Sequence, residues 1–335
     1  MNIKKFRFVI FVLVFSILTV LLFSLGINAE EQYVLRLAHD QTSGHPYDLG
    51  AQRFGEAVEA RTNGAVTIKI YPASQLGDTA EQIEGLKMGT LDLSIAAFSH
   101  VSQFVPELGI FGAPYLFESD KQFANVFDGE VGQILDNISL KRYDIRLLTT
   151  YTSGNRVLFN SKRSVFTPND LEDLKIRVMT GPADALTWKT FGAIATPMAY
   201  SELYSAMQAG VVDGGENECV SVLRNKFYEP CPYIATTYHL VLPMGVFISN
   251  KTFQELPEEY RKIVLEEAQK SAIWERDYIT RMNNEALDEM ISKYGVKANL
   301  IDKVAFMEKG KPVQEIVAKK LGVMDLLEKI RAAKN

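Results

Sequence analysis

The chain has 335 residues and carries 36 Lys and Arg against 41 Asp and Glu, a net charge of −5. A chain this acidic has no general attraction for nucleic acid or for anionic lipid, so we expect no nucleic acid among its partners. Any anion that it binds must therefore be held by a local cluster of positive charge.

The first 29 residues are a segment of their own. Lys4, Lys5 and Arg7 precede an apolar run over residues 8–25, and a cleavage site ends at Ala29. This order is typical of a secretory signal peptide, so we predict a periplasmic protein. The run is also long enough for the alternative of an uncleaved membrane anchor, because a spanning helix needs ~20 residues.

The 306 residues that follow can bury a large core, and at ~100–200 residues per domain they predict two domains. The two cysteines of the chain are Cys219 and Cys231, and an oxidising compartment would permit a bridge between them. A helix predicted over residues 221–228 would hold their Cα atoms beyond the ~7 Å limit for a disulfide, which disfavours the bridge.

In chain order, strands alternate with helices. The first half is a strand at 33–38, a loop at 39–46, a helix that ends at 60, a strand at 66–71, a helix that opens at 78 and a strand at 91–97. Asp78 and Glu81 have the spacing of a capping box, and Gly89 is the predicted stop of that helix.

The second half repeats the pattern. It has a strand at 176–179, a helix from 182 that ends at Gly192, a short strand at 193–197 and a helix capped by Ser201 that stops at Gly210. Asp92 and Asp213 each end a Gly-x-x-Asp stretch that follows a helix. This repetition predicts two lobes of similar wiring, with chance similarity of common turns as the alternative.

We therefore predict an α/β fold of two lobes, each a mixed sheet flanked by helices. In such sheets ligands bind beyond the carboxyl ends of the strands. Residues 257–293 would form one helix of ~55 Å that spans both lobes, or two helices with a bend near Asn283.

Arg156 and Arg177 stand in apolar, strand-like surroundings. We place Arg177 on a strand, Arg156 in a turn between two strands, and a further turn at residues 213–217. A guanidinium is always charged, and its planar fork of donors suits a carboxylate, so the pair predicts a receptor for an organic acid. The alternative for either arginine is a surface ion pair, such as Arg177 with Glu172.

Other candidate site residues have equally plain alternatives. Asn217 orients a ligand or serves only its turn, and Tyr200 stacks on a ligand or staples the next helix. His39, Asp40 and His45 share one loop that offers a conceivable metal site, but their spacing matches no usual zinc motif. No nucleophile elbow or phosphate-binding loop occurs, so a hydrolase would have to use unmarked residues.

Seven stretches, in order and at matching spacing, resemble the extracytoplasmic solute receptors of tripartite ATP-independent periplasmic (TRAP) transporters, the DctP family. The resemblance covers essentially the whole chain after the first 29 residues. The stretches are YPASQLG at 71–77, GTLD at 89–92, KIRV at 175–178, PMAYSE at 197–202, GVVDGGEN at 210–217, KFYE at 226–229 and LPE at 256–258.

The resemblance implies a two-lobed periplasmic solute-binding fold with a long helix across both lobes. It implies capture of a small organic acid, delivery to membrane permease subunits, no cofactor and no enzymatic activity. It places the main carboxylate-binding arginine on Arg177, a second on Arg156, an asparagine on Asn217 and a cleft aromatic on Tyr200. Glu216 and Thr180 are further candidate ligand-binding residues. Glu216 precedes the asparagine in a turn that departs from the usual family sequence, which leaves the substrate class open.

Some positions speak against sialic acid. Sialic-acid receptors carry Asn where this chain has Thr180, and acidic residues where it has Thr79 and Ala97. The loop with His39, Asp40, Gln41 and His45 is expected to face the cleft and bind hydroxyls, which favours a sugar acid such as a hexuronate or keto-gulonate. Protonated His39 or His45 would instead suit a C4-dicarboxylate.

The expected divisions are a signal peptide at 1–29, lobe I at 30–152 plus about 243–282, and lobe II at 153–242 plus about 283–335. Two other functions remain as alternatives. One is a secreted metal-dependent hydrolase built on the loop from His39 to His45, and the other is a ligand receptor for a sensor kinase.

Overall fold

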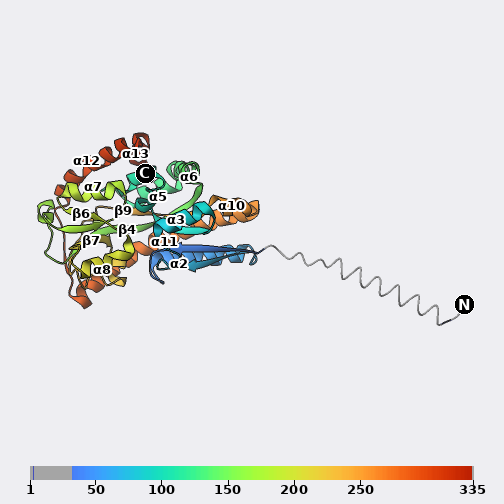
Figure 1. Cartoon of the computed structure of the whole chain (residues 1–335), viewed down its shortest axis with the longest axis horizontal. Coiled ribbons are helices and arrows are strands. Elements are labelled where there is room, and N and C mark those ends of the chain that lie inside the picture. Colours follow the sequence, from blue (N-terminus) through green and yellow to red (C-terminus); the bar gives the residue numbers. More distant parts are fainter. Residues whose placement is uncertain (1–2, 4–31, 334–335) are drawn as a thin grey trace. The chain divides into compact units, whose positions relative to one another are not determined.

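The strand β4 (Ile145–Asn160) joins two sheets and is the centre of the fold (Figure 1). A computed structural model describes residue 3 and residues 32–333, so apart from Ile3 the predicted signal peptide lies outside the described residues. None of the described helices is long and apolar enough to cross a membrane.

The first sheet has the order β2-β1-β3-β9-β4, and the second continues it as β4-β7-β5-β6. β8 pairs with β4 and with β10. Parallel and antiparallel pairs occur in both sheets, which confirms the predicted α/β fold with mixed sheets. The other strands are β1 (Tyr33–His39), β2 (Val66–Tyr71), β3 (Leu93–Ala97), β5 (Lys175–Val178), β6 (Ile194–Pro197), β7 (Gly214–Glu218), β8 (Tyr233–Ala235), β9 (Val241–Ser249) and β10 (Lys297–Asn299).

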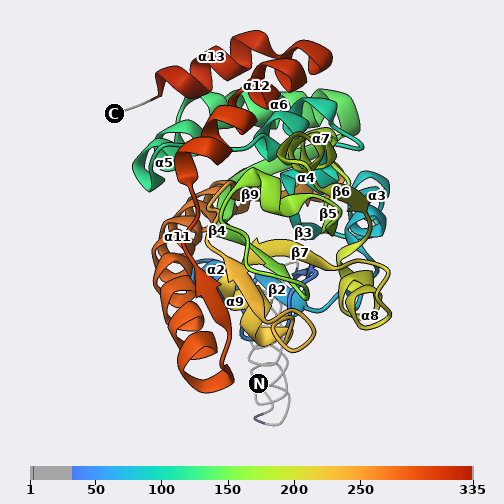
Figure 2. The ribbon, with the colours of Figure 1, turned by 90° about the vertical axis from the view of Figure 1, so that its left-hand side faces the viewer.

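Helices cover the faces of both sheets (Figures 1 and 2). The α-helices are α2 (Pro46–Arg61), α3 (Thr79–Met88), α4 (Phe98–Val101), α5 (Asp120–Asp128), α6 (Glu130–Tyr143), α7 (Pro182–Phe191), α8 (Leu203–Gln208), α9 (Cys219–Arg224), α10 (Asn250–Glu255), α11 (Glu258–Tyr294), α12 (Lys303–Leu321) and α13 (Met324–Ala332). Three 3₁₀ turns are η1 (Pro106–Gly112), η2 (Pro168–Leu171) and η3 (Tyr200–Glu202).

Local sequence signals set several helix ends as predicted. Asp78 and Glu81 form the capping box of α3, and Gly89 ends that helix with a left-handed φ of 69°. The predicted cap at Ser201 is wrong, because Ser201 lies inside η3 and α8 begins after it without a side-chain cap. The helix predicted over 221–228 is shorter and earlier, since α9 spans Cys219–Arg224.

The aspartates of the two Gly-x-x-Asp stretches have the same structural role. The Asp92 carboxylate accepts the backbone N–H of Arg36 on β1 at 2.9 Å. The Asp213 carboxylate accepts the backbone N–H of Lys175 at the start of β5, also at 2.9 Å. Each aspartate therefore ties a helix-to-strand junction to a neighbouring strand, which is the common wiring that the repetition predicted.

Two predicted turns are strands instead. Arg156 does not lie in a turn, because β4 runs without interruption through residues 145–160. Gly154 has φ 69° within it, but the irregularity is a register shift against β9 between Thr152 and Asn155. The predicted turn at 213–217 is largely β7, since pairing with β4 overrides the turn preference of its glycines.

The long helix α11 is a single uninterrupted helix of 37 residues, so the alternative of two helices is wrong (Figure 2). It holds β4 where that strand passes from one sheet to the other. Glu275 accepts the backbone N–H of Thr152 at 3.0 Å, and the Asn283 amide donates to the carbonyl of Ser153 at 3.1 Å. The helix therefore braces the crossing point between the sheets.

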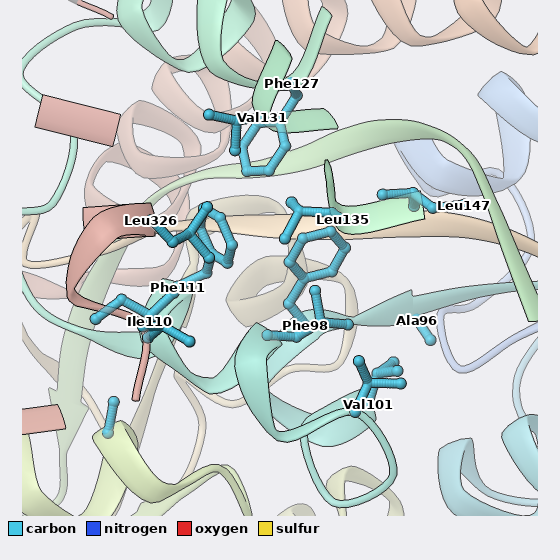
Figure 3. Close-up of a cluster of buried hydrophobic side chains, with 14 of the residues drawn as sticks. Ala96, Phe98, Val101, Ile110, Phe111, Phe127, Val131, Leu135, Leu147 and Leu326 are labelled. Carbon is cyan, nitrogen blue, oxygen red and sulfur yellow. The ribbon is translucent and has the colours of Figure 1, made fainter. Parts of the chain in front are cut away.

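A cluster of buried apolar side chains fixes one wall of the fold (Figure 3). Phe98 of α4 packs edge-on against Phe111 and Phe127, with ring centroids 5.4 and 5.7 Å apart. Val313 of α12 and Leu326 of α13 belong to the same cluster. This packing holds the short helix α4, whose polar residues reach the site described next.

Candidate functional site

A polar cavity lies where the carboxyl ends of β1, β3 and β5 face β7, as expected for sheets of this kind. Its volume is about 20 Å³, and we call it the inner cavity. Asp40, His100 and Tyr200 also line a second hollow of about 160 Å³, the outer cavity, so the two are neighbours. The space at this site therefore has two neighbouring compartments.

Arg177 of β5 lines the inner cavity and is only 1% exposed. Its Nε and Nη2 both donate to the carbonyl of Met198, at 3.1 and 2.9 Å. A guanidinium has five N–H groups, so three remain without a partner in residues 32–333. Burial lowers the pKa of Arg177, yet an arginine stays charged in a protein, so this cation still requires an anion.

Arg156 of β4 is also buried, but the protein already engages four of its five N–H groups. Its Nε and Nη2 bind the carboxylate of Glu216, Nη2 also binds the carbonyl of Glu216 at 2.7 Å, and Nη1 binds Glu218 at 3.2 Å. Burial acts to lower the pKa of Arg156, but the carboxylates of Glu216 and Glu218 outweigh it and raise that pKa. Only one of its N–H groups remains for a ligand.

The pairing of β4 with β7 explains this ion pair. Arg156 lies directly opposite Glu218, and Glu216 is its diagonal neighbour on the same face. Although burial acts in the opposite direction, Arg156 lowers the pKa of Glu216 to about 2. Glu216, predicted as a ligand-binding residue, is thus engaged with Arg156 and does not line either cavity.

Tyr200 lies beside Arg177, and Asn217 lines the same inner cavity. The Tyr200 ring centroid is 5.8 Å from the Arg177 guanidinium. The Tyr200 hydroxyl accepts from the amides of Asn225 at 3.0 Å and Asn217 at 3.4 Å, and lies 3.4 Å from the Gln41 side-chain oxygen. This hydroxyl therefore links the loop after β1 to the second sheet.

Asp40 lines both cavities, and its Oδ1 is buried without a hydrogen-bond partner in the described part of the chain. Burial raises the pKa of Asp40, and Glu218 adds to this while His39 acts against it. An unpaired buried oxygen costs free energy unless a donor reaches it, so Asp40 is poised to accept from a ligand.

The two loop histidines do not face either cavity. His39 Nε2 lies 3.3 Å from Asp48, and His45 Nδ1 accepts the backbone N–H of Tyr47 at 3.2 Å. His45 Nε2 lies 3.4 Å from Glu218, but burial lowers the pKa of His45. Within residues 32–333 no three His, Cys, Asp or Glu side chains gather to hold a metal ion.

Some lining residues were not predicted. His100 lines both cavities, its Nδ1 is 2.9 Å from the Thr180 hydroxyl, and burial with the nearby arginines lowers its pKa to about 3. Glu218 lines the inner cavity, and its signal was the Glu-x-Glu alternation with Glu216. Thr180, by contrast, was a candidate ligand-binding residue, and it lines the outer cavity, as do Thr79 and other hydroxyl side chains. Cys219 and Cys231 are buried free thiols.

Contacts across the site hold the two sides together. Ser221 of α9 donates to the Gln41 side chain at 3.1 Å. On the other side, Ser99 of α4 donates to Asp184 of α7 at 3.3 Å. Polar contacts therefore join the elements that surround the inner cavity.

Two sheets joined by the long strand β4, a helix that braces their crossing point, and a cavity lined by an arginine without a counter-ion among the described residues are the features of a two-lobed solute-binding protein. The family model described as bacterial extracellular solute-binding protein, family 7 (DctP), matches residues 37–320. The chain belongs to this family, the solute-binding proteins of TRAP transporters, which confirms the resemblance.

Relatives with known structures or ligands cover most of the chain. A TRAP periplasmic solute-binding protein from Sulfitobacter sp. NAS-14.1 with bound β-D-galacturonate is 31% identical, has a TM-score of 0.84 and covers 89% of this chain and 99% of its own. One from Sulfurospirillum deleyianum DSM 6946 with bound succinate is 28% identical, with TM-score 0.84, covering 91% and 100%. The 2,3-diketo-L-gulonate-binding periplasmic protein YiaO of Escherichia coli K12 is 27% identical, covering 85% and 87%.

These relatives are ligand-binding transport proteins that work with membrane permease subunits, which confirms the predicted class and partner. The family consists of periplasmic proteins, so it supports a periplasmic location for this chain. The similarity spans both sheets, since residues 37–320 run from β1 into α12.

Proposed function

We propose that this protein captures a sugar acid in the periplasm, with the ligand carboxylate on Arg177, and delivers it to its permease. A cleaved signal peptide over residues 1–29 would bring it there. The observation that carries the proposal is the buried Arg177 guanidinium, which has three unpaired N–H groups at the inner cavity. A carboxylate offers the opposite charge and the matching planar geometry.

The other site residues support that anchor. Arg156 contributes at most one N–H, and Glu216 and Glu218 hold it in place. Tyr200 covers Arg177, and Asn217 supports the Tyr200 hydroxyl and lines the cavity. The rest of the ligand would extend toward the outer cavity, where Thr79 and Thr180 offer hydroxyls.

The ligands of relatives favour a sugar acid. Galacturonate is bound in the relative from Sulfitobacter, and D-glucuronate in one from Chromohalobacter salexigens. The enclosed site has the form expected of a receptor that closes by a hinge motion. The lobes at 30–152 with about 243–282, and at 153–242 with about 283–335, would be the moving parts.

A thermal-shift screen of hexuronates, aldonates, keto acids and C4-dicarboxylates, followed by calorimetry, tests this function. Arg177→Ala should weaken binding of the best ligand at least tenfold, because a lost charge-assisted pair costs more than ~1.4 kcal/mol. Arg281→Ala, at an exposed arginine over Tyr278, is the matched control and should bind like wild type. Wild-type affinity in folded Arg177→Ala would refute the anchor.

We also propose that the protein is not an enzyme. The loop histidines are engaged with Asp48, Glu218 and the backbone, and no member of the loop presents a free histidine to a cavity. The ligand should therefore be recovered unchanged after prolonged incubation with the protein. Turnover, or zinc bound at unit occupancy, would favour the hydrolase instead.

A further inference from the structure

We propose that the site selects hydroxylated acids with one carboxylate and rejects dicarboxylates, and that Asp40 is the residue that determines this specificity. The inference rests on the proposed function, because it assumes that Arg177 holds one ligand carboxylate. It goes further, since family members with similar folds hold ligands as different as galacturonate and succinate.

The charges that line the two cavities carry the argument. The inner cavity presents Arg156, Arg177, Glu218 and Asp40, and the outer cavity presents Asp40 and Asp78. Arg156 is already matched by two carboxylates, Glu216 and Glu218. One ligand carboxylate therefore neutralises Arg177, and the described lining of both cavities offers no further lysine or arginine.

The histidines do not supply the missing cation. His100 is neutral at neutral pH, because burial and the nearby arginines lower its pKa to about 3. His45 is buried, accepts a backbone N–H at Nδ1, and has a lowered pKa because of burial. His39 is turned toward Asp48 and lines neither cavity. Besides the two arginines, the lining of both cavities would thus offer a second ligand carboxylate only acidic or neutral groups.

Asp40 stands where the two cavities meet. Its Oδ1 has no hydrogen-bond partner among the described residues, so a ligand hydroxyl that donates to it satisfies a buried acceptor. A carboxylate at the same place offers no donor and adds a like charge to the field of Asp40 and Glu218. Asp40 therefore stabilises a bound ligand hydroxyl and destabilises a second ligand carboxylate at the same place.

Matched ligands test this directly. Galactonate and galactarate share one carbon skeleton and differ at C6, where a hydroxymethyl group is replaced by a carboxylate. Calorimetry at pH 7.5 would compare this pair, glucuronate with glucarate, and erythronate with tartrate, and would include succinate. We expect the best monocarboxylate to bind at least tenfold more tightly than any dicarboxylate.

Asp40→Asn should lower the ratio of monocarboxylate to dicarboxylate affinity at least tenfold. It should do so by weakening the binding of the monocarboxylate and strengthening that of the dicarboxylate. Asp277→Asn removes the same charge from the exposed face of α11 and should leave the ratio unchanged. A dicarboxylate that binds as tightly as the best monocarboxylate, or a folded Asp40→Asn with the wild-type ratio, would overturn the specificity proposal. If none of these acids binds wild type, the proposed function fails; equal binding that Arg177→Ala abolishes refutes only the specificity.

Discussion

Arg156 and Arg177 lie in the same site and are almost equally buried, yet their surroundings differ completely. Arg156 binds two carboxylates and has one unpaired N–H group among the described residues. Arg177 binds one carbonyl and has three unpaired N–H groups among the same residues. The difference teaches that a buried arginine is either part of the fold or part of the binding site, according to whether the protein already supplies its anion.

The largest effect is expected at Arg156. Arg156→Met should lower the free energy of unfolding by ~3–5 kcal/mol, because it leaves Glu216 and Glu218 buried without their arginine. Urea denaturation measures this. Arg142→Met, which breaks the surface pair with Glu107, is the control and should cost at most ~1 kcal/mol. Equal losses in both variants would show that Arg156 has no special structural role.

Asp184 tests whether Arg177 truly lacks a counter-ion. Burial, with Glu216 adding to it, raises the pKa of Asp184 to about 7, which would not happen if Arg177 paired with it. The folded state then binds an extra proton between pH 4 and 7, so the stability of the wild type falls as pH rises through that window. Asp184→Asn removes this dependence.

The variant Asp184→Asn should gain stability over wild type on the order of 4 kcal/mol at pH 8, from ~1.4 kcal/mol per pKa unit, and almost nothing at pH 4. Thermal melts of both proteins at several pH values check this. A variant that is less stable than wild type at pH 8 would mean that the carboxylate is paired and that the contrast between the arginines is wrong.

Arg177 should affect binding and leave stability alone. Arg177→Met is expected to lose at least tenfold in affinity, about 1.4 kcal/mol, while its free energy of unfolding stays equal to or above that of wild type. No carboxylate is left unpaired by this change, unlike at Arg156. A large loss of stability without ligand would show that Arg177 is a second structural arginine.

The smallest effect is expected from the Tyr200 hydroxyl. Tyr200→Phe keeps the ring over Arg177 but removes the acceptor of the Asn217 and Asn225 amides, at a cost of ~0.5–1.5 kcal/mol. Calorimetry should therefore show less than a tenfold loss in affinity. Tyr200→Ala removes the ring as well, so a loss no larger than in Tyr200→Phe would contradict the role given to the ring.

Local signals predicted much of the fold because they act over a few residues. The capping box at Asp78 and Glu81 and the stop at Gly89 need only neighbouring backbone groups. The turn assigned around Arg156 and the turn at 213–217 were wrong because β4 and β7 pair over a long sequence distance. The lobe boundaries remain a prediction. The helix α12 contacts residues assigned to each predicted lobe, because Phe306 packs on Phe191 and Val313 belongs to the cluster around Phe98.

Within the site, Arg177 was identifiable because a charged residue on a short apolar strand requires an explanation. The engagement of Arg156 was not, since it depends on the register that sets Glu216 and Glu218 beside it. His39 and His45 illustrate the same limit: their partners Asp48 and Glu218 come from a helix and a distant strand. The residue types in the sequence therefore indicate the candidate residues, whereas their contacts with distant segments determine which of them are free to bind a ligand.

The most direct test of the contrast between the arginines is a crystal structure with a bound sugar acid, such as galactonate or glucuronate. We expect the ligand carboxylate on the free N–H groups of Arg177, with Arg156 still bound to Glu216 and Glu218. A carboxylate bound mainly by Arg156, with Glu216 displaced and Arg177 unoccupied, would contradict it.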